Sequence, residues 1–280
     1  MAARRALAAL AVAAVSISFA APLVRLAHVS GPVAAWWRLL VGSLLTLLAA
    51  VAAGEVPEAR VLARALPGGV LLATHFALWF ESLRFSSIAS STGIVVAYPV
   101  LAAVLDYARG SAGRRVVAAS LLGAAGVAAL STPWAGATLT GSLLAFAAAA
   151  AAAGYFVLGR RLRVGGASTL EYTLSVYSAA FAVLSVYLAV RGVNPLRVPR
   201  GSIPVLVALG VVPMIGGHTA MNYALAYMPA SRVTLVALVE PYGASLLGWL
   251  LLGERLPLAA LPGLLATSLA VWAAFREEAG

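Results

Sequence analysis

The chain has 280 residues, of which 62% are hydrophobic and only 10% are charged, and its formal net charge is +10 at pH 7. Because soluble domains contain about 25% charged residues, this composition excludes a soluble globular protein and predicts a polytopic membrane protein. All basic residues are arginines and cysteine is absent, which excludes a P-loop lysine, a Schiff-base lysine, disulfides and thiolate metal ligands. We assign the positive charge to loops at the membrane surface and expect no nucleic-acid partner.

Ten stretches of the chain are apolar and long enough to cross a bilayer, which takes roughly 20 residues. We predict that each forms a helix, and they lie near 6–27, 32–53, 67–84, 88–107, 115–131, 139–158, 168–190, 202–225, 231–252 and 257–275. The first stretch has features of a secretory signal, but its apolar run is long for one, and we expect it to be retained as a span. The connections are too short to hold a second soluble domain. The predicted fold class is an all-α polytopic membrane protein with ten transmembrane helices.

The distribution of arginines predicts the orientation in the membrane. If the N-terminus is inside, the inner loops hold about twice as many arginines as the outer loops. Since cytoplasmic loops are enriched in basic residues, both termini are predicted to be cytoplasmic and the chain to lie in the cell membrane. A cluster on the predicted outer side does not follow this rule, and it consists of Arg191, Arg197 and Arg200.

The third and eighth predicted spans resemble each other. The segment from Thr74, THFALWFESLRFSSIASSTGIVVAYPVLAAVL, aligns with the segment from Gly217, GHTAMNYALAYMPASRVTLVALVEPYGASLL. Successive spans cross the membrane in alternating directions. Because five is an odd number, an offset of five helices makes the two halves run through the membrane in opposite directions. Such inverted repeats are common in secondary transporters. We therefore predict two five-helix repeats, at residues 1–135 and 136–280.

Two pairs of polar or aromatic side chains are placed on helix faces by this alignment. His75 aligns with His218 and Trp79 with Asn222, and each pair is spaced i, i+4, so its members share one face of a helix. For His218, a place on a substrate pathway and a packing role remain open alternatives. For His75, packing against a neighbouring helix is favoured.

Glu240 is an acidic residue inside an apolar span, which makes it a functional-site hypothesis. Desolvation favours the neutral form of a carboxyl group, so Glu240 is predicted to carry a proton during transport or to bind a cationic substrate group. The alternatives are a structural hydrogen bond or an ion pair with Arg38. Glu240 precedes Pro241, and Pro99 occupies the aligned position of the fourth span. Because proline removes a helical hydrogen bond, both prolines are predicted hinges.

Arg38 follows two tryptophans early in the second span and is predicted to lie near the outer surface. It could bind the carboxylate of a substrate, or its side chain could extend to the membrane interface. Tyr98 could line the pathway, although an aromatic residue at helical spacing also suits packing. Four charged residues at helix ends are predicted caps or ion pairs, and they are Glu81, Arg84, Glu254 and Arg255.

Signatures of enzymes and metal sites are missing from the sequence. It contains no HExxH and no GxSxG motif, and Asp106 is its only aspartate, so an intramembrane aspartyl dyad is excluded. Three dispersed histidines without cysteine do not form a recognisable metal site. We expect no catalytic residue, no metal and no cofactor.

The sequence resembles the EamA-type permeases of the drug/metabolite transporter superfamily along essentially its whole length. The segments that carry the resemblance are SFAAPLVRLA, WWRLL, THFALWFESLRFSSIASSTGIVVAYPV and GHTAMNYAL…SRVTLVALVEPYGASLLGWLLLGE. The resemblance implies ten helices in two inverted halves, a central cavity lined by the first four helices of each half, and a carrier of amino acids or other small metabolites that is in some cases dimeric. The first half departs from the pattern, because Asp106 is the nearest acid where a counterpart of Glu254 is expected.

Together these observations predict a secondary active transporter that exports a small organic metabolite, such as an amino acid, by alternating access coupled to a proton gradient. The predicted substrate-binding residues are His218, Asn222, Glu240, Trp79, Arg38, Tyr98 and His75. The expected partners are the small-molecule substrate, the lipid bilayer, a proton and a second copy in a homodimer. An uncoupled facilitator and a non-transporting membrane scaffold or sensor are the alternatives.

Overall fold

A computed structural model describes residues 2–128, 136–255 and 261–275. These residues form helices joined by short loops, with no strand among them. In chain order the elements are α1 (Ala2–Ser18), α2 (Ala20–Leu26), α3 (Gly31–Ala53), α4 (Ala59–Ser82), α5 (Ile88–Val95), α6 (Tyr98–Ala108), α7 (Arg114–Val127), α8 (Leu139–Val164), α9 (Thr169–Val190), α10 (Ser202–Gly210), the π-helix η3 (Val211–Thr219), α11 (Ala220–Ala224), α12 (Ala230–Thr234), the 3-10 helix η4 (Leu235–Val239), α13 (Glu240–Leu252) and α14 (Leu261–Phe275).

Eight helical stretches in the described residues are long and apolar enough to cross a membrane. They correspond to eight of the predicted spans and are Arg4–Leu26, Gly31–Ala53, Ala59–Ser82, Ile88–Ala108, Leu139–Val164, Thr169–Val190, Ser202–Ala224 and Ala230–Leu252. The chain is therefore a multi-pass, all-helical membrane protein. The fifth and tenth predicted spans contain the shorter helices α7 and α14, with 14 and 15 residues, and parts of both, 129–131 and 257–260, lie outside the described residues.

Two predicted helix boundaries were wrong. The third span was expected to begin at Pro67, but α4 begins at Ala59 and contains this proline in its interior. The neighbouring apolar side chains and the packing of α4 against α8 and α9 support the helix through this position. The sixth span was expected to end near 158, but α8 continues to Val164. Its last turn contains Arg161 and Arg163, and cations there interact favourably with the helix dipole.

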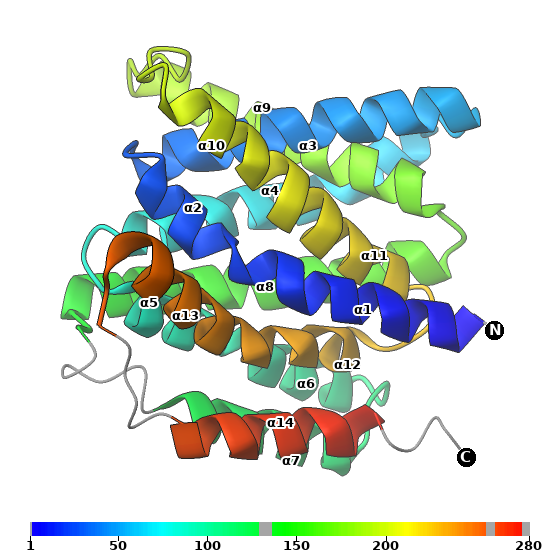
Figure 1. The fold of residues 1–280 in the computed structure, drawn as a ribbon. Coiled ribbons are helices and arrows are strands. Elements are labelled where there is room, and N and C mark those ends of the chain that lie inside the picture. The colour runs from blue at the N-terminus through cyan, green and yellow to red at the C-terminus, as the bar shows by residue number, and fades with distance from the viewer. Residues whose placement is uncertain (1, 129–135, 256–260, 276–280) are drawn as a thin grey trace.

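The long helices form a bundle whose central members come from both halves of the chain (Figure 1). Helix α4 packs against α8 and α9, and α3 packs against α9. Helix α1 lies against η3, α11 and α13, while α7 and α14 pair with each other along one side of the bundle. The first turn of α1 and the last turn of α14 lie at the same end of the bundle (Figure 1).

Four of the membrane-spanning stretches are interrupted near their middles. The first is broken between α1 and α2 at Phe19, and the fourth between α5 and α6, with Pro99 at the second position of α6. The stretch Ser202–Ala224 contains the π-helix η3. The stretch Ala230–Leu252 contains η4 before α13, with Pro241 at the second position of α13. Interrupted helices at membrane depth are tolerated where they surround a protein cavity, and they often form binding sites in transporters.

Glycines allow close helix contacts at two places. A Cβ atom on Gly216 would collide with the side chain of Ser16 in α1, and one on Gly217 with the side chain of Ile17. The backbone of η3 therefore packs directly against α1. Helices α7 and α14 also cross closely, where a Cβ atom on Gly126 would meet the backbone of α14. Small residues at such crossings are typical of helix packing in membranes.

Candidate functional site

A small enclosed cavity lies where the interrupted helices meet α3 and α4. We call it the central cavity, and its lining residues are Ile17, Ala20, Arg38, His75, Trp79, Val95, Tyr98, His218 and Glu240. Each of them is at most 5% exposed. The cavity volume is about 10 Å³, which is room for roughly one water molecule. The lining includes every predicted substrate-binding residue except Asn222.

Arg38 is buried, which corrects the expectation that it lies near the outer surface. Its side chain is 0% exposed and stacks over Phe76 of α4, with the guanidinium carbon 4.2 Å from the ring centroid. Its Nη2 atom donates a hydrogen bond to the carbonyl oxygen of Pro213 in η3, at 2.9 Å. The Nη1 atom has no hydrogen-bond partner among the residues that the structure describes. Arg38 therefore presents an unused donor inside the protein and does not extend to the membrane interface.

Glu240 is the first residue of α13 and is 4% exposed. Its Oε1 atom has no hydrogen-bond partner within the described part of the chain. Among the described residues, no ion pair within 4.0 Å joins Glu240 to Arg38, so the structural ion pair considered from the sequence is not formed in this conformation. A negative charge in the first turn of a helix is favoured by the helix dipole. The free oxygen gives the cavity an acceptor opposite the donor of Arg38.

The two histidines differ in how they are held. His75 Nδ1 lies 3.0 Å from the carbonyl oxygen of Ala148, and because a carbonyl only accepts, this nitrogen carries the hydrogen. Its ring stacks on Trp79 at 5.7 Å between centroids. His218 lies 6.1 Å from His75 between ring centroids, and its Nδ1 atom has no partner. The contact with Ala148 fixes His75, while His218 keeps a free nitrogen.

Asn222 does not line the central cavity. Its Oδ1 accepts a hydrogen bond from the Tyr155 hydroxyl at 2.9 Å, and its Nδ2 lies 3.2 Å from the Tyr177 hydroxyl. The Tyr155 ring in turn lies 6.0 Å from His218 between centroids. Asn222 thus belongs to a hydrogen-bonded layer behind the cavity wall, and its role in substrate binding stays a prediction.

Several buried polar atoms that have no hydrogen-bond partner in the described part of the chain gather around the central cavity. Four buried atoms on its lining make no hydrogen bond to any described residue, and they are Arg38 Nη1, Trp79 Nε1, His218 Nδ1 and Glu240 Oε1. Buried polar groups are nearly always paired, because an unpaired one costs about 1–3 kcal/mol. Four around one cavity make it the candidate ligand-binding site. No group of three or more potential metal-ligating side chains occurs in the described residues.

At the end of the bundle opposite the termini, a set of polar contacts joins the ends of α2 and α13 to the loop before α5 and to the start of α5. Arg25 at the end of α2 donates to the carbonyl oxygen of Ser86 at 2.6 Å and lies 3.6 Å from Glu254. Glu254, just after α13, also accepts from the backbone N–H of Ile88 at 3.0 Å. We call this set the Glu254 cluster. It caps the first turn of α5 and closes this end of the bundle, as expected for an acid at a helix end.

A corresponding set of contacts lies at the end of the bundle that carries the termini. Asp106 in α6 accepts from the backbone N–H of Ser231 in α12 at 2.8 Å. Arg160 in α8 donates to the carbonyl oxygen of Leu225, and it interacts electrostatically with Asp106. We call this set the Asp106 cluster. Sequence reasoning did not identify it because Asp106 and Ser231 are 125 residues apart, and the absence of a Gly-Glu pair concealed the similar position of Asp106.

Comparisons with known proteins agree with this architecture. The family model of the EamA-like transporter family matches residues 139–276, which confirms the resemblance to the drug/metabolite transporter superfamily. A solved structure titled "Crystal structure of protein" is similar in fold, with a TM-score of 0.74 over 99% of this chain and 96% of that chain, at 19% sequence identity. No curated protein matches the sequence.

Proposed function

We propose that this chain, which belongs to the EamA-like transporter family through residues 139–276, is a secondary active transporter of small zwitterionic metabolites such as amino acids. The observation that carries the proposal is the set of four buried polar atoms without partners around the central cavity. A carrier binds its substrate by replacing the water that the substrate loses, so unused donors and acceptors at membrane depth indicate a binding site.

The chemistry of the lining favours a substrate that carries both charges. Arg38 and Trp79 offer N–H donors that suit a carboxylate, and Glu240 offers an acceptor that suits an ammonium group. The aromatic rings of Phe76 and Tyr98 lie around the same site and would contact the apolar part of the substrate. The cavity of about 10 Å³ is too small for an amino acid, so binding requires the helices to separate.

We propose further that the chain consists of two inverted five-helix repeats, residues 1–135 and 136–280, with ten transmembrane helices. The helix packing supports this. When each helix is replaced by its counterpart five spans away, the same pairs of helices are in contact. The contact of α4 with α8 corresponds to that of η3 and α11 with α1, and α6 with α8 corresponds to α13 with α1. The contacts of α3 with α9 and of α7 with α14 each join two counterparts.

The two polar clusters support alternating access as the transport mechanism. The Glu254 cluster closes one end of the bundle and the Asp106 cluster closes the other, so both routes to the cavity are shut in this conformation. Each cluster uses an arginine, a backbone carbonyl and a carboxylate that caps the N-terminus of a helix. Opening either cluster separately would expose the cavity to one side, and the breaks before Pro99 and Pro241 provide the bending points.

Proton coupling is assigned to Glu240, because its carboxyl group is buried, lines the cavity and has a free oxygen. A proton bound there would remove the charge that holds a substrate ammonium group. Proton entry from one side and substrate release from the other would then drive export through the cell membrane, with both termini in the cytoplasm.

The substrate proposal can be tested by ligand-dependent thermal stability of the purified protein. A ligand that binds only the folded state stabilises it, by an amount that rises with the logarithm of its affinity and concentration. We expect at least one free amino acid to raise the unfolding temperature, while its carboxyl-amidated and N-acetylated derivatives have little effect. Arg38→Gln should abolish the response. Equal stabilisation by the free and amidated forms, or an unchanged response in Arg38→Gln, would contradict the proposal.

A further inference from the structure

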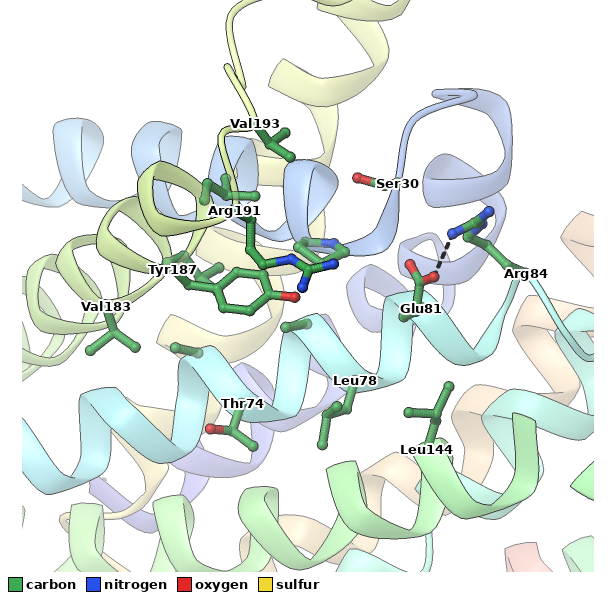
Figure 2. Close-up of a pocket in the computed structure, with 15 residues that line it drawn as sticks. Ser30, Thr74, Leu78, Glu81, Arg84, Leu144, Val183, Tyr187, Arg191 and Val193 are labelled. Carbon is green, nitrogen blue, oxygen red and sulfur yellow. Dashed lines mark hydrogen bonds and ion pairs between the residues drawn. The ribbon is translucent and has the colours of Figure 1, made fainter. Parts of the chain in front are cut away.

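A second and larger cavity lies on the outside of the bundle between α4 and α9 (Figure 2). We call it the α4–α9 groove, and its volume is about 530 Å³. Ala73 and Ala77 of α4 line it, whereas His75 and Trp79, two residues further along the helix, line the central cavity. Because alternate positions on a helix point to different faces, the groove and the central cavity lie on different sides of α4 and share no lining residue.

The groove is apolar at one end and charged at the other. Its lining runs from Ala73 to Glu81 on α4 and from Val183 to Arg191 on α9, which is about 12 Å along each helix at 1.5 Å per residue. The charged residues of the lining, Glu81, Arg84 and Arg191, lie where the helices reach their loops, at the end opposite the termini. An apolar slot within the span and charges at its boundary match the polarity of a membrane lipid.

The net charge at the mouth of the groove comes from Arg191. Glu81 is already paired, because its Oε1 lies 2.5 Å from Arg84 and its Oε2 accepts from the backbone N–H of Gly31 at 3.2 Å. The Arg191 side chain has no hydrogen bond or ion pair to any part of the chain that the structure describes. Figure 2 shows Arg191 and Tyr187 extending from the end of α9 toward α4, above the apolar part of the groove.

The loop after α9 has the pattern of a segment at the lipid headgroups. Three apolar side chains in this part of the chain are exposed, and they are Val190 at 82%, Val193 at 41% and Leu196 at 64%. They alternate along the sequence with the arginine cluster that includes Arg197 and Arg200. Apolar side chains that enter the lipid beside arginines that face phosphates are typical of membrane-interface segments. Binding to anionic lipid also explains why arginines gather on the side opposite the termini.

We propose that the α4–α9 groove binds one anionic phospholipid of the adjacent leaflet, with an acyl chain in the apolar part and the phosphate group on Arg191. The planar guanidinium binds phosphate through charge-assisted hydrogen bonds. Such a lipid would contact both α4 and α9. The site is separate from transport chemistry, so it can be tested without any substrate.

The experiment is native mass spectrometry of the full chain in detergent with phosphatidylglycerol or phosphatidylcholine of identical acyl chains. We expect one phosphatidylglycerol to be retained, roughly tenfold more tightly than phosphatidylcholine, from the strength of a charge-assisted contact. Arg191→Gln should remove this preference. Arg200→Gln is the matched control, because it changes the charge of the same loop outside the groove and should behave like wild type. Ala77→Phe fills the groove and should weaken both lipids.

Several results would overturn the proposal. These are equal retention of the two lipids by the wild-type protein, phosphatidylglycerol binding unchanged by Arg191→Gln, and equal losses in Arg191→Gln and Arg200→Gln. Competition by glycerol phosphate as strong as that by the whole lipid would show a site for a soluble anion. Arg191 is exposed, so its substitution leaves folding intact, and it decides the outcome if Ala77→Phe does not fold.

Discussion

The middle of the bundle and its two ends differ in how their acidic side chains are held. Around the central cavity, Arg38 and Glu240 each keep an atom without a partner. At the ends, the carboxylates of Glu254 and Asp106 cap helices in the opposite half of the chain. In the proposed mechanism the ends stay closed without a ligand, whereas the middle is completed when a ligand binds. Substitutions should therefore affect binding in the middle and conformation at the ends.

The largest effect is expected from Arg38→Gln in the middle. Removing one partner of a buried charge contact costs about 2–5 kcal/mol of binding, so the apparent substrate affinity should fall at least roughly 30-fold. Arg109→Gln, an exposed arginine at the end of α6, is the control and should retain wild-type affinity. The measurement is the concentration dependence of substrate flux in liposomes. An affinity within about twofold of wild type in Arg38→Gln would contradict the assignment.

Glu240→Gln separates substrate movement from its driving force. The amide cannot exchange a proton, so flux should lose its dependence on pH while the protein remains folded in the membrane. The measurement is exchange flux across a series of symmetric pH values. Glu58→Gln makes the same change at an exposed acid outside the cavity and should keep the wild-type profile. Unchanged pH dependence in Glu240→Gln would remove Glu240 from the coupling mechanism.

Asn222→Ala tests the hydrogen-bonded amide of Asn222, which lies behind the wall of the central cavity. It would leave the buried hydroxyls of Tyr155 and Tyr177 without their contacts to the amide, which we expect to lower the free energy of unfolding by about 1–3 kcal/mol. Thermal unfolding checks this. If stability is unaffected while substrate affinity falls, Asn222 binds the substrate directly, as the sequence predicted, and its assignment to a structural layer behind the cavity wall is wrong.

The smallest effects on stability are expected at the ends. Asp106→Ala and Glu254→Ala each remove a helix cap, which costs about 1 kcal/mol, but they should open opposite sides of the protein. Because the sequence has no cysteine, Ala20→Cys provides a single reporter in the cavity. Glu254→Ala should speed its labelling from the side opposite the termini, and Asp106→Ala from the side of the termini. Identical labelling patterns in the two variants would contradict separate closure of the two ends.

Most of the residues that line the central cavity could be named from the sequence, but not how each of them is held. Glu240 and His75 were found because a polar side chain in an apolar span is conspicuous. Asn222 was placed on the face of His218 by α-helical spacing, but His218 lies in the π-helix η3, which changes the direction of the following side chains. The depth of Arg38 depends on its contacts with Phe76 and Pro213, which no local pattern contains.

The arrangement of the ends could not be predicted, because it depends on contacts between distant segments. Sequence reasoning recognised Glu254 as a helix-end residue but could not identify Ile88 as its partner, 166 residues away. It named Asp106 as the nearest acid where the Gly-Glu pair is missing in the first half, but it did not identify a symmetric role for this residue. Asp106 makes a similar cap from within α6, so the chemistry is kept although the motif is not.

The central claim is gradient-driven transport through the central cavity, and flux in liposomes tests it most directly. The purified protein would be reconstituted and given a mixed pool of amino acids and other metabolites, with and without an imposed pH gradient. The account predicts that at least one zwitterionic compound accumulates against its concentration gradient only when the pH gradient is present. Movement that stops at equal concentrations would identify an uncoupled facilitator, and no movement of any zwitterion in the pool would contradict the proposed transport function.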